Sequence, residues 1–209
     1  MPSVKAVLFD YGLVLSGPPD PNAWERLKVL LNANEAAFHE AYWKHRDAYD
    51  RGSLTAEAYW QQVAHGLGCT LDEPTTRQLI ADDTDVWTQP NQPMIDWAAA
   101  LQRAGMKTGI LSNIGDAMER EIVARTPWLA GFNHHTFSHR LKMAKPEPAI
   151  YAHAAEGLGV APGDILFIDD REENIAAAHA AGMQAVRYVS HDDFLQAMRD
   201  QGYASLLSL

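Results

Sequence analysis

Three features are scarce in this chain of 209 residues, and each absence narrows its function. Cys69 is the only cysteine, so no disulfide can form within the chain and a reducing compartment is expected. Lys and Arg number 17 against 27 Asp and Glu, giving a formal net charge of -10. Nucleic acid or an anionic membrane as the main partner would require a basic face, so this charge argues against both.

Long apolar runs are also missing. No run approaches the roughly 18 residues of a membrane-spanning helix, and the apolar run near the N-terminus is too short for a signal peptide. We therefore expect a cytoplasmic protein that does not act at a membrane. A small phosphorylated ligand stays possible, because surface charge is screened within about 8 Å and a metal ion or lysine sets the potential inside a pocket.

The remaining pattern indicates an α/β fold. Short apolar runs predict strands at 4–9, 107–111, 135–138, 165–168 and 184–188, and helical stretches between the later strands cover 94–104, 117–124, 147–157 and 172–181. Strands that alternate with helices of this length favour a parallel sheet with helices on both faces. Ligands of such sheets bind at the carboxyl ends of the strands.

Residues 18–90 interrupt this alternation with helices alone. The expected helices cover 21–32, 36–49, 55–67 and 74–86, separated by the breakers "NAN", "DRGS" and "GLGCTLDEP". A helical block inserted after the first strand is best interpreted as a cap over the active face. We therefore predict a core domain formed by residues 1–17 and 91–209 and a cap domain formed by residues 18–90.

Polar side chains follow the predicted strands where each one ends. They are Asp10, the Ser112-Asn113 pair, Lys145 in the loop "KMAKPEPAIY", and the Asp169-Asp170 pair. Each alone has an ordinary explanation as a turn, a helix cap or an exposed charge. Together they place three carboxylates at one edge, which repel each other unless a cation such as Mg²⁺ lies among them. A hydroxyl, backbone amides and a lysine beside them would hold a phosphoryl group.

Four motifs carry a family resemblance. "VLFDYG", "ILSN", "KPEPAIY" and "FIDDREENI" match, in order and spacing, the motifs of the haloacid dehalogenase-like (HAD) hydrolase superfamily, subfamily IA, and the helical block stands where that subfamily has its C1 cap. The resemblance extends from residue 4 to about residue 190. It implies a Rossmann-like core with a parallel sheet of strand order 5-4-1-2-3.

The resemblance also implies roles for single residues. Asp10 would be the nucleophile that forms an aspartyl-phosphate, and Lys145 would hold nucleophile and phosphate together. Ser112 and Asn113 would bind the phosphate. The Mg²⁺ ligands would be Asp10, the backbone carbonyl of Gly12 and Asp170, with Asp169 in support. The substrate would be a small phosphorylated metabolite, for example a sugar phosphate.

Gly12 departs from the common pattern of the superfamily. Most of its phosphatases have a second Asp at this position, which serves as general acid and base and contributes typically 10²–10⁴-fold to the rate. A branch with Gly here is similar to sugar-phosphate phosphatases. Without a replacement acid, the rate should depend steeply on the leaving-group pKa, so anomeric and acyl phosphates should react better than phosphates of simple alcohols.

Two other functions remain open. A catalytically impaired relative could bind a phosphometabolite or a protein partner, although a mere binder would not require Asp10. A 2-haloacid dehalogenase is disfavoured, because those relatives work without metal and lack the acidic pair that this chain has in "FIDD".

Substrate choice depends on the cap. Side chains that could face the substrate are Tyr42, His45, Arg46, Tyr49 and Arg51, and His45 is our candidate for the missing acid because its usual pKa of about 6.5 suits proton transfer. The tryptophans Trp24, Trp43, Trp60 and Trp87 are expected to pack within the cap. A transition-metal site at His134, His135 and His139 has little support, since no cysteine or carboxylate lies nearby in sequence. The sequence permits a monomer or a homodimer.

Overall fold

A computed structural model describes residues 3–209, and its centre is a five-stranded sheet with the order β3-β2-β1-β4-β5. All neighbouring strands are parallel. The strands are β1 (Ala6–Phe9), β2 (Lys107–Ser112), β3 (His134–Phe137), β4 (Ile165–Asp169) and β5 (Gln184–Arg187). The predicted strand order is confirmed, and each strand lies within two residues of its predicted range.

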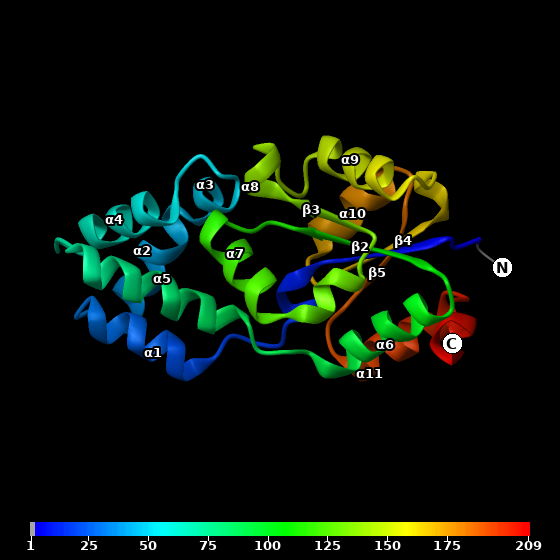
Figure 1. Ribbon diagram of the computed structural model, residues 1–209, viewed down its shortest axis with the longest axis horizontal. Helices are drawn as coiled ribbons and strands as arrows, with labels where there is room; N and C mark the ends of the chain where they lie inside the picture. The colour runs from blue at the N-terminus through cyan, green and yellow to red at the C-terminus, as the bar shows by residue number, and fades with distance from the viewer. Residues whose placement is uncertain (1–2) are drawn as a thin grey trace.

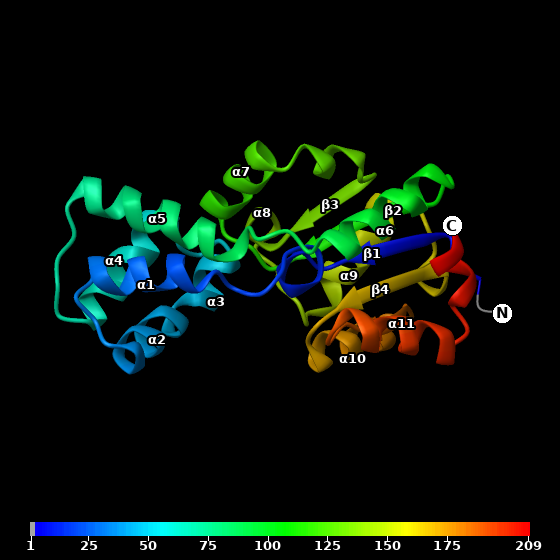
Figure 2. The ribbon, with the colours of Figure 1, turned by 90° about the horizontal axis from the view of Figure 1, so that it is seen from below.

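The sheet is the middle of three layers, because alternate residues of its strands point to opposite faces. Val7 and Phe9 pack in one apolar cluster with α6 (Gln92–Arg103), α7 (Asp116–Arg125) and α11 (His191–Asp200). Ala6 and Leu8 pack in another with α9 (Pro148–Leu158) and α10 (Glu172–Ala180). Figures 1 and 2 show these helices on the two faces of the sheet. The prediction missed α11 and the short helix α8 (Ser138–Leu141).

Five helices between β1 and α6 form a separate helical lobe with its own apolar core. They are α1 (Pro21–Leu30), α2 (Glu35–Lys44), α3 (Arg46–Asp50), α4 (Ala56–Gly66) and α5 (Glu73–Trp87). The side chains of Asp20, Asn34, Thr55 and Asp72 cap the first turns of α1, α2, α4 and α5, which explains where these helices begin. The lobe lies beyond the carboxyl ends of the strands (Figure 2). The domain boundaries at 17/18 and 90/91 stay a prediction.

The single helix predicted for 36–49 is wrong. His45 leaves the helical conformation, with φ -117° and ψ 6°, and thereby separates α2 from α3. The next residue, Arg46, is buried and forms ion pairs with Asp50 and with Asp83 of α5. The break therefore gives α3 its own direction, which the local sequence pattern did not predict.

The lobe is fastened to the core by contacts around α3. Ser138 at the start of α8 donates a hydrogen bond through its hydroxyl to the backbone carbonyl of Asp50 and accepts one from the backbone N–H of Ile114, at 2.8 Å. The ring of Tyr49 lies directly against Gly115, which caps α7. These contacts fix α3 relative to the loop that follows β2.

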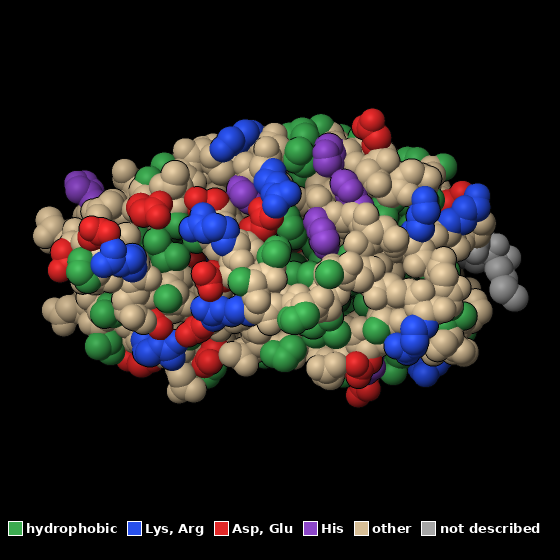
Figure 3. All heavy atoms as spheres, in the orientation of Figure 1, with side chains coloured by type: hydrophobic (Ala, Val, Ile, Leu, Met, Phe, Trp, Pro, Cys, Tyr) green, Lys and Arg blue, Asp and Glu red, His purple; other side chains and the backbone are tan. Residues whose placement is uncertain are grey.

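Figure 3 shows Lys and Arg side chains mixed with Asp and Glu, mainly on the left part of this face. Within residues 3–209, no helix is long and apolar enough to cross a membrane.

Gly115→Ala should weaken the contact between lobe and core. A Cβ at residue 115 would lie 2.1 Å from Cζ of Tyr49, so the buried ring must move. We expect a loss of about 1–3 kcal/mol in the free energy of unfolding, as for other overpacked sites. Denaturant unfolding measures it, and Gly66→Ala in α4 is the control because its Cβ would meet only an ordinary contact at 3.8 Å. Equal stability of the two variants would contradict the packing described here.

Candidate active site

The ends of β1 and β4 and the loop before α9 meet at one buried lysine. The ammonium Nζ of Lys145 lies 2.8 Å from Oδ2 of Asp10 and 2.7 Å from Oδ2 of Asp169. The three residues are buried, with relative exposures of 5% for Lys145, 7% for Asp10 and 0% for Asp169. An ammonium held by two carboxylates stays charged, and the pKa of Lys145 is raised by both partners against the effect of burial.

Asn113 fixes this lysine through its backbone. Its side-chain Oδ1 accepts a hydrogen bond from the backbone N–H of Lys145 at 2.8 Å, and its Nδ2 donates one to the Lys145 carbonyl at 2.9 Å. Both polar ends of the Asn113 side chain are therefore occupied. The neighbouring hydroxyl of Ser112 has no hydrogen-bond partner among residues 3–209, and Ser112 lines the cavity together with Asp10. Within this pair, Ser112 has the side chain that is free to meet a ligand.

Three carboxylates make the site suitable for a divalent cation. Oxygens of Asp10, Asp169 and Asp170 lie within 4.8 Å of one another, the only such group of three metal-ligating side chains in the described part of the chain. Burial raises the pKa of Asp10 to about 7, although Lys145 acts against this shift. Burial and the neighbouring Asp169 also raise the pKa of Asp170. Lys145 alone leaves this cluster with excess negative charge, which a hard cation with oxygen ligands would neutralise.

Asp169 is held by groups around it. Its Oδ1 accepts hydrogen bonds from the backbone N–H of Arg171 and from Nδ2 of Asn174, both at 2.9 Å, while its Oδ2 faces Lys145. Asp170 instead lines the cavity. That Asp170 binds a metal directly and that Asp169 supports it stays a prediction.

Gly12 lies beside Asp10 at the edge of the cavity. Its backbone angles, φ -62° and ψ 131°, are accessible to every residue, and a Cβ there would meet nothing within 4 Å. Neither strain nor crowding therefore requires glycine at this position. Gly12 also lines a smaller recess of about 120 Å³, together with residues such as Trp87, Ile114 and Met118.

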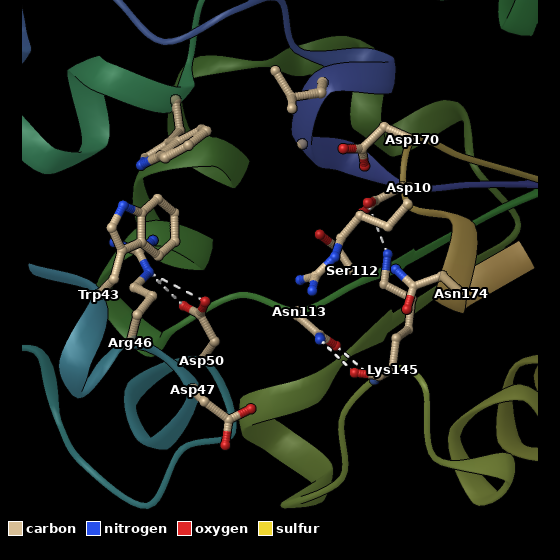
Figure 4. A pocket seen from close by; sticks show the side chains of 14 residues that line it. Asp10, Trp43, Arg46, Asp47, Asp50, Ser112, Asn113, Lys145, Asp170 and Asn174 are labelled. Carbon is tan, nitrogen blue, oxygen red and sulfur yellow. Dashed lines mark hydrogen bonds and ion pairs between the residues drawn. The ribbon is translucent and has the colours of Figure 1, made fainter. Parts of the chain in front are cut away.

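The main cavity, of about 360 Å³, lies between the strand ends and the helical lobe (Figure 4). The lobe contributes Trp43, Arg46, Asp47, Asp50 and Trp87. The ring of Trp43 packs against Tyr42 and Trp87, as expected, but Trp43 is also 44% exposed and lines the cavity, as Trp87 does. The expectation holds for Trp60, which is fully buried.

Of the lobe residues predicted to face a substrate, only Arg46 lines the cavity. Tyr42 and Tyr49 are buried inside the lobe, where their rings surround the guanidinium of Arg46 at 5.1 and 5.4 Å from the ring centres. His45 lies at the break between α2 and α3 and is not among the lining residues. Sequence reasoning missed Asp47 and Asp50, although the spacing Arg46-x-x-x-Asp50 was a signal for an ion pair on one helix face.

The histidines near β3 have separate surroundings. His135 contacts the backbone carbonyl of Leu129 at 3.1 Å, and His139 pairs with Glu119. The ring of His134 lies 5.6 Å from that of His153. These rings do not form a group of three metal ligands, so a transition-metal site here has no support among residues 3–209.

Comparison with known proteins identifies the family. The haloacid dehalogenase-like hydrolase model matches residues 4–182, and the chain belongs to this family. The chain is similar to bifunctional epoxide hydrolase 2 of Rattus norvegicus, with 34% identity over 89% of this chain and 34% of that protein. It is also similar to phosphoglycolate phosphatase of Xylella fastidiosa, with 34% identity over 45% of this chain and 43% of that protein. The chain thus spans only about a third of the length of the epoxide hydrolases that it matches.

The fold has close relatives among solved structures. The HAD family enzyme bt-2542 of Bacteroides thetaiotaomicron superimposes with a TM-score of 0.77 at 23% identity, covering 93% of this chain and 98% of that one. A second structure of that enzyme is a complex with magnesium and inorganic phosphate. Haloacid dehalogenases are also among the relatives and the structural neighbours. At these identities the structural likeness establishes the α/β fold of the family.

Mg²⁺ should stabilise the folded protein through the acidic cluster. A cation at a hundredfold excess over its Kd contributes about 2.7 kcal/mol, which corresponds to a rise of about 5–10 °C in Tm for a chain of this size. Asp170→Asn should remove most of this rise, whereas Asp192→Asn at the exposed start of α11 should keep it. Thermal unfolding with and without Mg²⁺ measures the effect, and equal shifts in both variants would place the cation elsewhere.

Proposed function

We propose that the protein is a Mg²⁺-dependent phosphatase that hydrolyses a small phosphorylated metabolite through an aspartyl-phosphate on Asp10. The observation that carries this proposal is the contact of Lys145 with both Asp10 and Asp169 at the floor of a cavity. A carboxylate held beside an ammonium group, with a free hydroxyl from Ser112 nearby, suits attack on a phosphorus atom.

The residues would divide the work as follows. Asp10 attacks phosphorus, Lys145 neutralises charge on Asp10 and on the phosphoryl oxygens, and Ser112 donates a hydrogen bond to the phosphoryl group. Asn113 keeps Lys145 in position through the two backbone hydrogen bonds described above. Mg²⁺ would be held by Asp10, the carbonyl of Gly12 and Asp170, with Asp169 in support, and it would neutralise phosphoryl charge.

The lobe favours an uncharged leaving group with hydroxyls, as a sugar would provide. Among the lobe residues that line the cavity, one cation, Arg46, stands beside two acids, Asp47 and Asp50. This excess of negative charge would repel a carboxylate. The indole rings of Trp43 and Trp87 offer apolar surface to the carbon skeleton of a sugar, while Asp47 and Asp50 accept hydrogen bonds from its hydroxyls.

Two alternatives have less support. A 2-haloacid carries a carboxylate that would meet this acidic lobe, and the Asp169-Asp170 pair would have no part in a reaction without metal. A protein that only binds phosphometabolites is favoured by Gly12 alone, since this position lacks the usual second acid. Asp10, Lys145 and Ser112 still face the cavity together, which a binder would not need.

Asp10→Asn should abolish hydrolysis of an activated aryl phosphate. The amide has nearly the volume of the carboxylate but is a far weaker nucleophile, so kcat should fall at least about 10³-fold. The fold should persist, because Lys145 keeps its ion pair with Asp169. Steady-state kinetics at saturating Mg²⁺ measure the loss, and Lys44→Ala on the exposed side of α2 is the control expected to retain full activity. Undiminished turnover by Asp10→Asn, or in excess chelator, would refute the proposed function.

Selectivity should follow the charge of the lobe. We expect kcat/KM for a sugar phosphate to exceed that for phosphoglycolate by about tenfold or more, equivalent to about 1.4 kcal/mol. Raising the ionic strength should narrow the ratio, because salt screens partly exposed charges. A preference for phosphoglycolate would contradict the proposed leaving-group class without affecting the assignment of Asp10.

A further inference from the structure

The space beside Asp10 has no acid at residue 12, but the opposite wall of the same cavity has one. Asp50 lies at the end of α3 and lines both the main cavity and the recess next to Gly12. Figure 4 shows Asp50 on the lobe side, across the cavity from Asp10, Ser112 and Asp170. A leaving group attached to a phosphate at Asp10 would extend into this gap.

Asp50 belongs to a buried cluster in which two carboxylates share one positive charge. Arg46 lies 3.0 Å from Oδ1 of Asp50 and 3.1 Å from Oδ1 of Asp83, so one guanidinium serves two acids. The side chain of Asp83 is 4% exposed and also accepts a hydrogen bond from the hydroxyl of Tyr42 at 2.6 Å. The side chain of Asp50 is 18% exposed and reaches the cavity. A proton that balances the cluster can therefore exchange with the cavity through Asp50.

The charges around Asp50 set its proton affinity. Burial raises the pKa of Asp50 to about 6, Arg46 lowers it, and Asp83 and Asp47 raise it. The phenol rings of Tyr42, Tyr49 and Tyr59 surround the guanidinium of Arg46 and keep water from it. A carboxyl group in this range can both give and accept a proton near neutral pH.

Contacts with the core also hold Asp50 in position relative to the expected phosphate site. Its backbone carbonyl accepts the hydrogen bond of the Ser138 hydroxyl, and the same hydroxyl accepts the N–H of Ile114, two residues after Ser112. The preceding residue, Tyr49, packs on Gly115 of the same loop. The side chain of Ser138 thus connects Asp50 of the lobe to the loop that lines the phosphate end of the cavity.

We propose that Asp50 is the proton donor that replaces the missing second Asp of the first motif, an inference that rests on the proposed function. In the first half-reaction, a carboxylate oxygen of Asp10 forms a bond to phosphorus and the bond from phosphorus to the leaving oxygen breaks. The leaving oxygen keeps the electron pair and takes the proton of Asp50. In the second, water attacks phosphorus and gives a proton to the Asp50 carboxylate, and the bond from phosphorus to Asp10 breaks, which restores both residues.

The test compares phosphate monoesters graded in leaving-group pKa, from a dinitrophenyl ester to a simple alkyl ester. An ester with a good leaving group needs little protonation, whereas an alkyl ester depends on it. Asp50→Asn should therefore lower kcat/KM for the alkyl ester about 10²-fold more than for the dinitrophenyl ester. The control is Glu40→Gln on the exposed side of α2, a lobe acid that lies outside the cavity lining and should leave the ratio between the two esters nearly unchanged.

A second variant guards against a structural explanation. Gly12→Asp introduces an acid where the backbone and the surrounding space accept one, so Gly12→Asp in the Asp50→Asn background should restore the alkyl ester selectively. A merely destabilised protein would not regain one substrate class in this way. Equal ratios in Asp50→Asn and Glu40→Gln, or no selective rescue, would overturn the role of Asp50.

The pH profile of the unmodified protein gives an independent readout. The ratio of alkyl to dinitrophenyl turnover should fall as pH rises through about 6, because Asp50 loses the proton that only the alkyl ester requires. Ionisation of Asp10 affects both esters and cancels in the ratio. A ratio that is constant across this range would overturn the proposal even if no Asp50 variant folds. Failure of the unmodified protein to hydrolyse even the dinitrophenyl ester would instead refute the phosphatase function.

Discussion

The buried ammonium of Lys145 is the interaction on which the site depends. It lies between Asp10 at the end of β1 and Asp169 at the end of β4, two carboxylates that would otherwise repel each other in a place that excludes water. Breaking such a buried pair by removing one partner costs about 3–5 kcal/mol. The same contact therefore joins two strands of the sheet and favours the ionised form of Asp10 against the effect of burial, so stability and reactivity both depend on Lys145.

The core and the lobe are coupled by different means. Within the core the strand ends converge because parallel strands place their carboxyl ends at one edge. The lobe instead reaches the core through α3, whose position relies on Ser138 and on the fit of Tyr49 against Gly115, and through the ion pair between Asp85 of α5 and Arg125 of α7. The catalytic residues and the lobe residues that line the cavity are thus positioned by separate contacts. The lobe can therefore change its lining residues without disturbing Lys145.

Sequence alone predicted the parts that local patterns encode. The strand ends at Asp10 and Asp169 follow from apolar runs, and the strand order followed from the four motifs. The surroundings of α3 could not be predicted, because the break at His45 depends on Arg46 turning inward to Asp83, which is 37 residues further along the chain. His45 was the candidate acid because of its usual pKa of about 6.5, whereas the helix after the break places Asp50 at the cavity.

The arrangement of Asp50 bears on why residue 12 is a glycine. A glycine enforced by backbone geometry would have φ in the left-handed region, as Leu13 does with φ 58°, yet Gly12 adopts ordinary extended angles in open space. The backbone therefore does not require glycine here. The lack of an acid at residue 12 means either that the acid function is dispensable or that another residue supplies it. An acid on the lobe would add a constraint that an acid at residue 12 lacks: proton transfer would occur only when α3 is seated against the core by Ser138, so that closing of the lobe over its ligand and protonation of the leaving group would be one event.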